Sequence, residues 1–494
     1  MKSRAFLLTR CSQRDYAEPG LDDSWLYFNK STTTRCKQVG EKNYNLNTII
    51  IKIYSLLPLK IQRSWKRIED SDIGNRIAKG AFWSLTGSVV SQGLILLASI
   101  VVARILGKTE YGEFGMIRST INMFTVFAGF GLGITATKFI AEFRIKDKIK
   151  TERIIGLTTI FAAITGGIIS ITILITAPFL AEKTINAPQL VNEIRLGAVM
   201  IFFSSLNGAY TGTLVGFESF KTIAKVNLIS GILAFPIQIG FTLLFGLPGS
   251  VIGIGINYLI LWLLNLMSVR QVCHKFGFKF QIKGSWNEWP VLYKFSLPAL
   301  LSGILVSPVM WACNAMLVNH PNGYGEMAIF DAANQWRNTI LFIPAILSQI
   351  VLPLLSSSTS NYHQFNKILK INIVINFLIV FIMAVVISLF SGIIMRSYGE
   401  GFAEGKLVLI ILSFSTIFIS INNIIGQAIA GKNKMWIGFA INILWGAILL
   451  FTTKFFLDKG MGALGLAFGY VISYTIHTGL QFSLLKGYIL TKKF

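Results

Sequence analysis

The chain contains 494 residues, of which 53% are hydrophobic and only 14% are charged. Soluble proteins carry charged residues at about a quarter of their positions, so this composition excludes a soluble domain and a disordered chain. The 44 glycines follow no strict repeat, which excludes a collagen-like fibre. The composition therefore predicts a membrane protein.

Long intervals without charged residues are the main structural signal, because about 20 apolar residues span a bilayer and a charge within the span is costly. The eleven longest intervals are 80–103, 119–137, 154–181, 196–217, 226–269, 295–325, 338–366, 371–395, 407–431, 435–453 and 460–485. The interval 226–269 carries Gly246-Leu247-Pro248-Gly249 near its middle, a turn signal that divides it in two. The intervals predict twelve transmembrane helices, and their continuous apolar character excludes a transmembrane β-barrel.

Lys and Arg are distributed unequally between the predicted loops. With twelve spans, one set of alternate loops holds 26 of these residues and the other holds eight. The richer set is expected in the cytoplasm, which predicts that both termini are cytoplasmic. Most of the net charge of +23 then reflects topology and attraction to anionic lipid headgroups, so no nucleic-acid partner is expected.

Residues 1–75 are polar and show no signal peptide. Two interpretations stay open: a disordered cytoplasmic segment, or a stretch upstream of the true translation start that is not native. The predicted domains are this segment at 1–75, a first six-helix bundle at 76–270, a cytoplasmic linker at 271–291, and a second six-helix bundle with a short cytoplasmic tail at 292–494.

The two predicted bundles share short motifs in the same order. The motif Tyr111-Gly112-Glu113 recurs as Tyr324-Gly325-Glu326, at an offset of 213 residues. At an offset of 215, the residues Gly216, Asn227 and Gly231 recur as Gly431, Asn442 and Gly446. Because six spans separate the copies, they keep the same orientation, which predicts a parallel pseudo-two-fold repeat along the membrane normal. The expected fold class is an all-α polytopic membrane protein with 12 transmembrane helices in two six-helix bundles.

Signals for catalysis are missing from the sequence. It contains no phosphate-binding GxxxxGK[ST] loop, and its four histidines and four cysteines are too scattered for a metal site or a Cys/His nucleophile. We therefore expect neither an enzyme nor a cofactor or metal. His477, the one histidine within a predicted span, is interpreted as a packing residue rather than a proton relay.

The eighth predicted helix carries polar side chains inside the membrane. Its residues Asp331, Asn334, Gln335 and Asn338 share one face, and Arg337 lies beside them on the same turn. Ionisable groups at this depth usually face a cavity or the bundle interior. Asp331 points about 120° away from Arg337 on a straight helix, so a direct pair between them is poor. We therefore expect Arg337 to meet an anionic substrate group, and a guanidinium suits phosphate because it presents a planar fork of donors.

The second predicted helix has a similar stripe, in which Arg118, Asn122, Thr125 and Gly129 lie on one face. This face is expected to look inward. Arg118 lies only about one turn inside the outer boundary, so a structural role for it, with its side chain reaching water, is equally compatible with the sequence.

Helix bending is expected in the first and seventh predicted helices. The seventh contains Pro298 and Pro308, and its counterpart contains Gly87 and Gly93. Proline removes a backbone hydrogen bond and kinks a helix, so these residues are candidates for a gate. A static kink is the alternative.

Several strings resemble Wzx-type O-antigen flippases of the multidrug/oligosaccharidyl-lipid/polysaccharide exporter superfamily. The strings are Phe295-Ser296-Leu297-Pro298-Ala299-Leu300-Leu301-Ser302-Gly303, Trp311-Ala312-Cys313-Asn314-Ala315, Phe330-Asp331-Ala332-Ala333-Asn334-Gln335-Trp336-Arg337 and Gly431-Lys432-Asn433-Lys434-Met435-Trp436. The string Ala103-Arg104-Ile105-Leu106-Gly107 resembles the family's first outer loop. The similarity covers about residues 76 to 490.

The resemblance implies a V-shaped, two-bundle transporter with a cationic cavity in the bacterial cytoplasmic (inner) membrane. Such a protein moves undecaprenyl-pyrophosphate-linked oligosaccharide units to the outer leaflet by alternating access, with the lipid tail remaining in the lipid bilayer. A polysaccharide polymerase and a chain-length regulator are the protein partners that it suggests. The glycan and any coupling ion stay open.

Two related functions are the alternatives. A cation/drug antiporter of the same superfamily would need buried carboxylates, and Asp331 is the one available within a predicted span. A lipid II flippase would recognise the same lipid-pyrophosphate group. A major-facilitator sugar porter is disfavoured because the loop 141–153 lacks the Gly-x-x-x-Asp-Arg-x-Gly pattern. A membrane-embedded glycosyltransferase is disfavoured by the absence of a large outer loop.

Overall fold

The computed structural model describes residues 72–280, 284–357, 362–431 and 435–485, and every element assigned within them is helical. Residues Met1–Arg76 and Ile77–Phe494 form two units, of which the second contains the membrane helices and is considered below. The predictions made for residues 1–71 lie outside the described residues.

The helices follow one another with short connections. In the first half they are α4 (Asp72–Gly129), α5 (Leu132–Phe143), α6 (Lys148–Phe179), η1 (Leu180–Thr184), η2 (Pro188–Leu190), α7 (Val191–Gly216) and α8 (Phe220–Lys275). In the second half they are η3 (Ser285–Glu288), η4 (Leu292–Ser296), α9 (Leu297–Gly303), α10 (Val306–Val318), α11 (Gly323–Ser357), α12 (Tyr362–Leu389), α13 (Ser391–Tyr398), η5 (Glu400–Gly405), α14 (Lys406–Gly431), α15 (Met435–Asp458) and α16 (Gly462–Leu484).

Two of these helices are broken by a glycine. Gly107 in α4 has φ 77° and ψ 178°, and Gly246 in α8 has φ 61° and ψ −134°. Only glycine adopts such angles without strain. Helices of 58 and 56 residues would be about 85 Å long, far more than one crossing of a hydrocarbon core of about 30 Å. The predicted turn at Gly246 is confirmed, whereas the outer loop expected at 103–107 is a single-residue break.

The described residues contain nine ranges that are long and apolar enough to cross a membrane, and two of them include these breaks. The count of twelve spans stays a prediction. The eighth predicted helix, in which Asp331 to Asn338 lie, is α11, and it begins at Gly323, well before the charge-free interval 338–366. Charged residues mark the boundary in the sequence, but Asp331 and Arg337 lie within the helix and are buried inside the protein.

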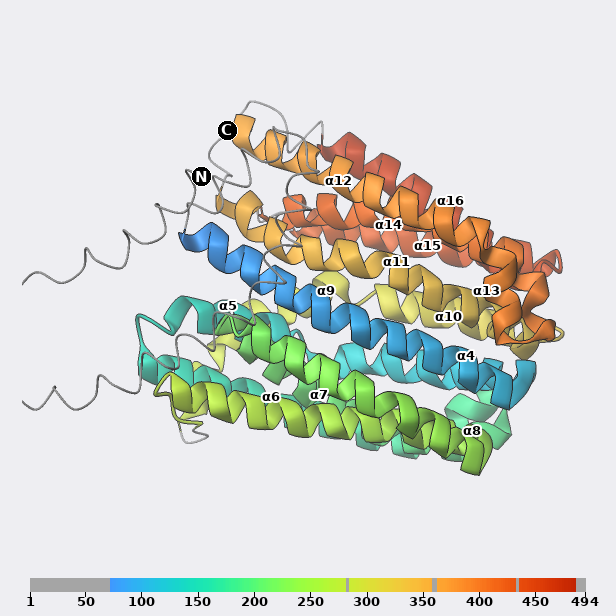
Figure 1. Cartoon of the computed structure of the whole chain (residues 1–494), viewed down its shortest axis with the longest axis horizontal. Coiled ribbons are helices and arrows are strands. Elements are labelled where there is room, and N and C mark those ends of the chain that lie inside the picture. Colours follow the sequence, from blue (N-terminus) through green and yellow to red (C-terminus); the bar gives the residue numbers. More distant parts are fainter. Residues whose placement is uncertain (1–71, 281–283, 358–361, 432–434, 486–494) are drawn as a thin grey trace, which may run out of the picture. The chain divides into compact units, whose positions relative to one another are not determined.

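The helices form two lobes (Figure 1). Helices α5 to α8 pack on one another in the first lobe, and α11 to α16 pack on one another in the second. Each lobe has a hydrophobic core of its own, around Tyr210 in the first and Phe365 in the second. A third core joins the lobes and includes Met116 from α4 and Phe330 from α11. The two-lobed, all-helical fold predicted from the sequence is confirmed.

Equivalent glycines of the sequence repeat allow equivalent helix contacts. A Cβ atom at Gly231 of α8 would lie 2.6 Å from the Ser91 Oγ of α4, and one at Gly446 of α15 would lie 3.0 Å from Val309 of α10. In each lobe, therefore, the fifth predicted helix of the repeat packs closely on the first. Small residues permit this approach between membrane helices.

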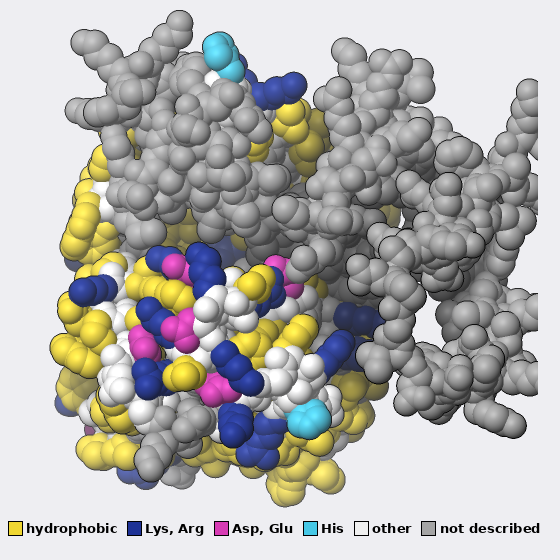
Figure 2. All heavy atoms as spheres, turned by 90° about the vertical axis from the view of Figure 1, so that its left-hand side faces the viewer, with side chains coloured by type: hydrophobic (Ala, Val, Ile, Leu, Met, Phe, Trp, Pro, Cys, Tyr) yellow, Lys and Arg dark blue, Asp and Glu magenta, His cyan; other side chains and the backbone are white. Residues whose placement is uncertain are grey.

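Charge is concentrated at one end of the second unit, which we call the basic end. It contains the α5–α6 and α7–α8 connections and the end of α8, and Figure 2 shows Lys and Arg side chains gathered there with fewer acidic ones. The opposite end contains the breaks at Gly107 and Gly246. Large hydrophobic side chains such as Ile168, Leu244 and Phe451 are exposed along the helices, as expected for a surface that faces lipid. Which end faces the cytoplasm stays a prediction.

Candidate functional site: a polar cavity between the lobes

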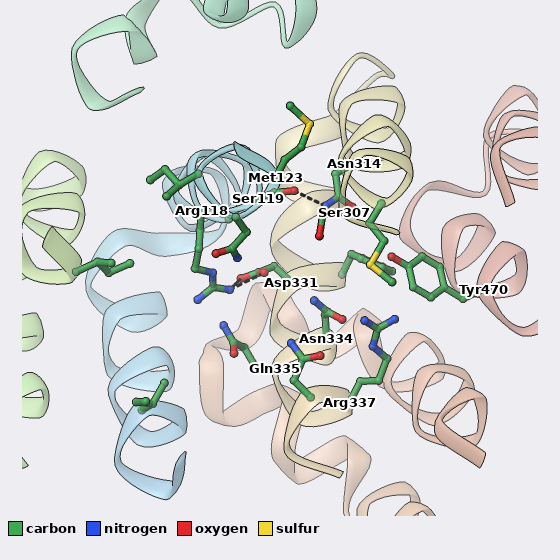
Figure 3. Close-up of a pocket in the computed structure, with 18 of the residues that line it drawn as sticks. Arg118, Ser119, Met123, Ser307, Asn314, Asp331, Asn334, Gln335, Arg337 and Tyr470 are labelled. Atoms are coloured by element: carbon green, nitrogen blue, oxygen red, sulfur yellow. Dashed lines mark hydrogen bonds and ion pairs between the residues drawn. The ribbon is translucent and has the colours of Figure 1, made fainter. Parts of the chain in front are cut away.

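A cavity of about 420 Å³ lies between α4 and α11, and α8, α10 and α16 complete its wall. Seven of the polar residues predicted to face inward line it: Arg118, Asn122, Asp331, Asn334, Gln335, Arg337 and Asn338. Thr125 and Gly129, which continue the predicted face of α4, are not among its lining residues. Figure 3 shows the labelled residues of α4 and α11 around this cavity. A volume of this size falls within the range of sites for small organic ligands.

Arg118 pairs with Asp331 across the two lobes. Its Nη2 donates to both carboxylate oxygens of Asp331, at 2.6 and 2.5 Å (Figure 3). The carbonyl oxygen of Gln335, with its amide oriented toward Arg118, also accepts from both terminal nitrogens of this guanidinium. The side chains of Arg118 and Asp331 are 23% and 6% exposed. The charge of Arg118 is therefore compensated inside the protein, and its side chain does not need to reach water.

Arg337 is held differently. Its guanidinium carbon lies 4.8 Å from the ring centroid of Tyr470, and the residue is only 5% exposed. Within the described part of the chain, its Nε and Nη1 atoms have no hydrogen-bond partner and it forms no ion pair. The intrahelical pair with Asp331 that helix geometry disfavours is not formed, since Asp331 binds Arg118. One guanidinium in the cavity thus keeps an uncompensated charge and unused donors.

Neutral polar groups surround the two arginines. The Oδ1 atom of Asn334 is buried and lacks a hydrogen-bond partner among the described residues. Asn314 donates from Nδ2 to the Ser119 hydroxyl at 2.9 Å, while its own Oδ1 is unsatisfied by any described group. Asn122 and Asn338 line the cavity, and both residues are exposed. Amide groups of this kind can donate to and accept from the hydroxyl groups of a ligand.

Several lining residues were not predicted from the sequence. They are Ser119, Tyr258, Ser307, Asn314 and Tyr470. Asn314 stands in one of the strings that carry the family resemblance, and this was the available signal for it. Tyr258 and Tyr470 lie in apolar helices, where an aromatic residue usually indicates packing, so their place at the cavity depends on how the helices dock.

The seventh predicted helix is bent at its prolines. The π-turn η4 precedes Pro298, and helices α9 and α10 are separated by Ile304 and Leu305. Pro308 cannot donate the hydrogen bond that the carbonyl of Ile304 would accept in a continuous helix, which explains the break. A Cβ atom at Gly93 would meet nothing within 4 Å, and the surroundings of Gly87 lie outside the described residues. A gating role for these four positions stays a prediction.

The arrangement of two helical lobes around a polar cavity is also the fold of solved multidrug transporters. A multidrug resistance MATE family transporter in an inward-facing conformation superposes with a TM-score of 0.65 at 16% identity, over 83% of this chain and 99% of that chain. The eukaryotic MATE transporter AtDTX14 gives a TM-score of 0.67 at 13% identity, over 84% and 96% of the two chains.

Within this fold, the chain belongs to the polysaccharide biosynthesis protein family, whose sequence model matches residues 77–359. It is 22% identical to the EPS I polysaccharide export inner membrane protein EpsE of Ralstonia nicotianae, over 78% of this chain and 88% of that protein. It is 21% identical to the lipid III flippase of Escherichia coli (strain K12), over 60% and 70% of the two proteins. These matches confirm the resemblance to Wzx-type polysaccharide flippases. The chain is a multi-pass membrane transporter and not an enzyme.

Proposed function

We propose that the protein translocates undecaprenyl-pyrophosphate-linked oligosaccharide repeat units across the cytoplasmic membrane, for O-antigen or other surface polysaccharide assembly. In this proposal the pyrophosphate and sugar pass through the cavity while the lipid tail stays in the bilayer. A charged head group cannot cross hydrocarbon unaided, because an ion without a partner in a medium of low dielectric is extremely unfavourable.

The uncompensated guanidinium of Arg337 is the observation that carries this proposal. A buried arginine without an ion pair is costly to maintain in a membrane protein and usually marks a substrate pathway. Its free Nε and Nη1 donors suit the oxygens of a phosphate group. The neighbouring amides of Asn334 and Asn314 suit sugar hydroxyl groups, so both parts of the head group find complementary chemistry in one cavity.

The membrane location and partners follow from the same proposal. The basic end would face the cytoplasm, with both termini on that side of a bacterial inner membrane. The EpsE relative is described as an inner membrane protein, which supports this location. A polysaccharide polymerase and a chain-length regulator are the proposed protein partners, because they would act on the translocated units.

The cavity charge disfavours the cation/drug antiporter. Among the described residues that line the cavity, two arginines face one carboxylate, which leaves a surplus of positive charge. A cationic drug would be repelled by Arg337. A lipid II flippase would share the lipid-pyrophosphate group, so the identity of the sugar must be decided by the lipid that accumulates in a deletion strain.

The proposal is tested by deleting the gene in its native host and analysing lipid-linked oligosaccharides. We expect undecaprenyl-linked repeat units to accumulate on the cytoplasmic side and surface polymer to be lost. Arg337→Ala should fail to restore polymer although the protein inserts normally, whereas Arg337→Lys should restore part of it. Arg195→Ala, which removes an exposed arginine of α7, is the matched control and should restore polymer fully. Full complementation by Arg337→Ala would refute the assigned site.

A further inference from the structure

The pyrophosphate of the proposed substrate carries an ionised oxygen on each phosphate, whereas the described lining of the cavity supplies one uncompensated guanidinium, that of Arg337. We propose that the head group enters the cavity as a chelate with one divalent cation, such as Mg²⁺, which bridges the two phosphates. The cation belongs to the cargo and not to the protein. This inference rests on the proposed function, because it requires a pyrophosphate in the cavity.

The other two ionised groups of the cavity compensate each other. Arg118 donates from Nη2 to both oxygens of Asp331, and its Nη1 and Nη2 also donate to the Gln335 carbonyl oxygen. Among the described residues that line the cavity, one positive charge is therefore left, at Arg337. A guanidinium that pairs with one phosphate leaves the charge of the second phosphate without a partner, which is costly where water is largely excluded.

The unsatisfied neutral groups of the cavity suit a hydrated cation better than a second phosphate. They are the Oδ1 atoms of Asn334 and Asn314, which are acceptors, as the oxygens of an ionised phosphate are. The donor of Asn314 is in use, because its Nδ2 is bonded to the Ser119 hydroxyl at 2.9 Å, and the residue is 8% exposed. Water bound to a cation carries the hydrogens that such amide oxygens need.

Asn334 is the amide that lies beside the bound pyrophosphate. It precedes Arg337 by three residues on α11, and side chains at this spacing are neighbours on a helix surface. In Figure 3 its amide lies between the Asp331 carboxylate and the Arg337 guanidinium. A phosphate held by Arg337 therefore places the bridging cation next to Asn334, whose Oδ1 accepts a hydrogen bond from a water ligand of the cation. Asn314, on α10, stays available to a sugar hydroxyl.

The substrate, rather than the protein, has to hold this cation. The part of the chain that the structure describes contains no group of three or more His, Cys, Asp or Glu side chains that could hold a metal ion. Mg²⁺ keeps several of its waters and is commonly bound through substrate phosphates, so it needs no such group. The chelate of a pyrophosphate diester with Mg²⁺ has no net charge, which lowers the desolvation cost of bringing both phosphates into the cavity.

The test measures how probe binding depends on Mg²⁺. The full-length protein in phosphatidylcholine nanodiscs is titrated calorimetrically with geranyl pyrophosphate, a water-soluble probe, over a series of free Mg²⁺ concentrations at constant ionic strength. Geranyl phosphate is the control probe, because a single phosphate cannot form the bridge. While most of the probe is free of metal, the affinity for geranyl pyrophosphate should rise about tenfold for each tenfold increase in Mg²⁺. The affinity for geranyl phosphate should not change, and sodium should not replace Mg²⁺.

Two variants test the contact with the cation. Asn334→Leu removes the acceptor oxygen, so the gain in affinity at saturating Mg²⁺ should shrink about five- to tenfold, the value of one hydrogen bond, while the affinity without Mg²⁺ stays the same. Asn192→Leu is the matched control, because Asn192 is an exposed residue in the first turn of α7, and it should behave like the unaltered protein. If Asn334→Leu does not fold, electron paramagnetic resonance of Mn²⁺ with the unaltered protein decides the question: bound metal should appear only when geranyl pyrophosphate is present.

The outcomes distinguish the two proposals. Binding of geranyl pyrophosphate that is equally tight with Mg²⁺ removed, or that sodium strengthens as much as Mg²⁺ does, would overturn the chelate and leave the proposed function standing. An equal dependence on Mg²⁺ for geranyl phosphate, or Mn²⁺ bound without any probe, would also overturn it, because the cation would then act on the protein or the membrane. If neither probe bound at any Mg²⁺ concentration, the result would count against the pyrophosphate-binding cavity, and so against the proposed function itself.

Discussion

Gly112 lies where α4 and α11 pack backbone against backbone near the opposite end of the protein. A Cβ atom added there would lie 1.8 Å from the carbonyl oxygen of Tyr324 and 3.1 Å from the backbone nitrogen of Ala328. Non-bonded heavy atoms prefer separations of about 3.5 Å or more, so Gly112→Ala would force the two helices apart by about 1.5 Å. The atoms that it meets belong to the backbone and cannot rotate away.

This substitution should weaken the contact between the lobes. Inserting a methyl group into a packed interface costs about 1–3 kcal/mol. The cost applies only while the lobes are closed at this end, where Arg104 also donates to the Ser397 carbonyl at 2.6 Å and Tyr324 donates to the Ile185 carbonyl at 2.8 Å. The equilibrium between closed and open states should therefore shift toward the open state about 5- to 150-fold.

Distances between spin labels at Lys183→Cys and Lys406→Cys measure this shift. Both residues are exposed at the opposite end, one in each lobe, and the native cysteines are replaced first. We expect Gly112→Ala to enrich the longer distances. Gly167→Ala in α6 is the control, because its Cβ atom would meet nothing within 4 Å. An unchanged distance distribution in a folded Gly112→Ala protein would refute the idea that this contact holds the lobes together.

Three further substitutions test other parts of the structure. Tyr470→Leu removes the ring beneath Arg337, and the loss of a desolvated cation–π contact of about 2 kcal/mol should weaken substrate binding about 30-fold. Tyr470→Phe keeps the ring and removes only the hydroxyl that contacts Arg337, so a titration with geranyl pyrophosphate should show a smaller loss of affinity. Gly246→Ala places a side chain at φ 61° and ψ −134°, which should lower the free energy of unfolding by about 1–3 kcal/mol, while thermal unfolding of Gly240→Ala should show no such loss. Pro308→Ala restores a hydrogen-bond donor to the bent helix, so a transport assay should show slower turnover without loss of thermal stability; unchanged turnover would identify a static kink.

Local periodicity was sufficient to predict the fold class and the polar helix faces. The spacing of Asn122 from Arg118, and of Gln335 from Asp331, places each pair on one side of a helix whatever the tertiary structure. Helix ends were harder to predict, because a charged residue marks a boundary only when it faces water or lipid headgroups. Asp331 and Arg337 face the interior, so the charge-free interval that begins at residue 338 covers only the later part of α11.

The pair between Arg118 and Asp331 depends on how the two lobes dock, and helix spacing contains no information about it. The repeat does contain such information, because these residues are 213 positions apart, which is the offset of the Tyr-Gly-Glu motifs. Residues related by a two-fold axis meet each other when they lie on that axis. The contact therefore indicates that the pseudo-axis passes between α4 and α11 at the cavity.

The uncompensated charge does not follow the repeat. The same offset relates Gln335 to Asn122, so both equivalent positions carry an amide side chain. It relates Arg337 to Phe124, however, and Phe124 packs against the core shared by the lobes. Arg337 contacts Tyr470, a residue of its own lobe. The repeat thus builds a symmetric lining near the axis, and the proposed phosphate-binding group lies in the second lobe alone.

If positions 118 and 331 are equivalent across the axis, their charges should be exchangeable. Arg118→Asp alone would set two buried carboxylates against each other, and Asp331→Arg alone would do the same with two guanidiniums. Loss of a buried pair destabilises a protein by about 3–5 kcal/mol. The double variant recreates the pair with reversed polarity, so its thermal unfolding should recover most of that loss. Should it be no more stable than the single variants, the two sites would not be equivalent, and the pair would depend on the particular surroundings of each side chain rather than on the pseudo-symmetry of the fold.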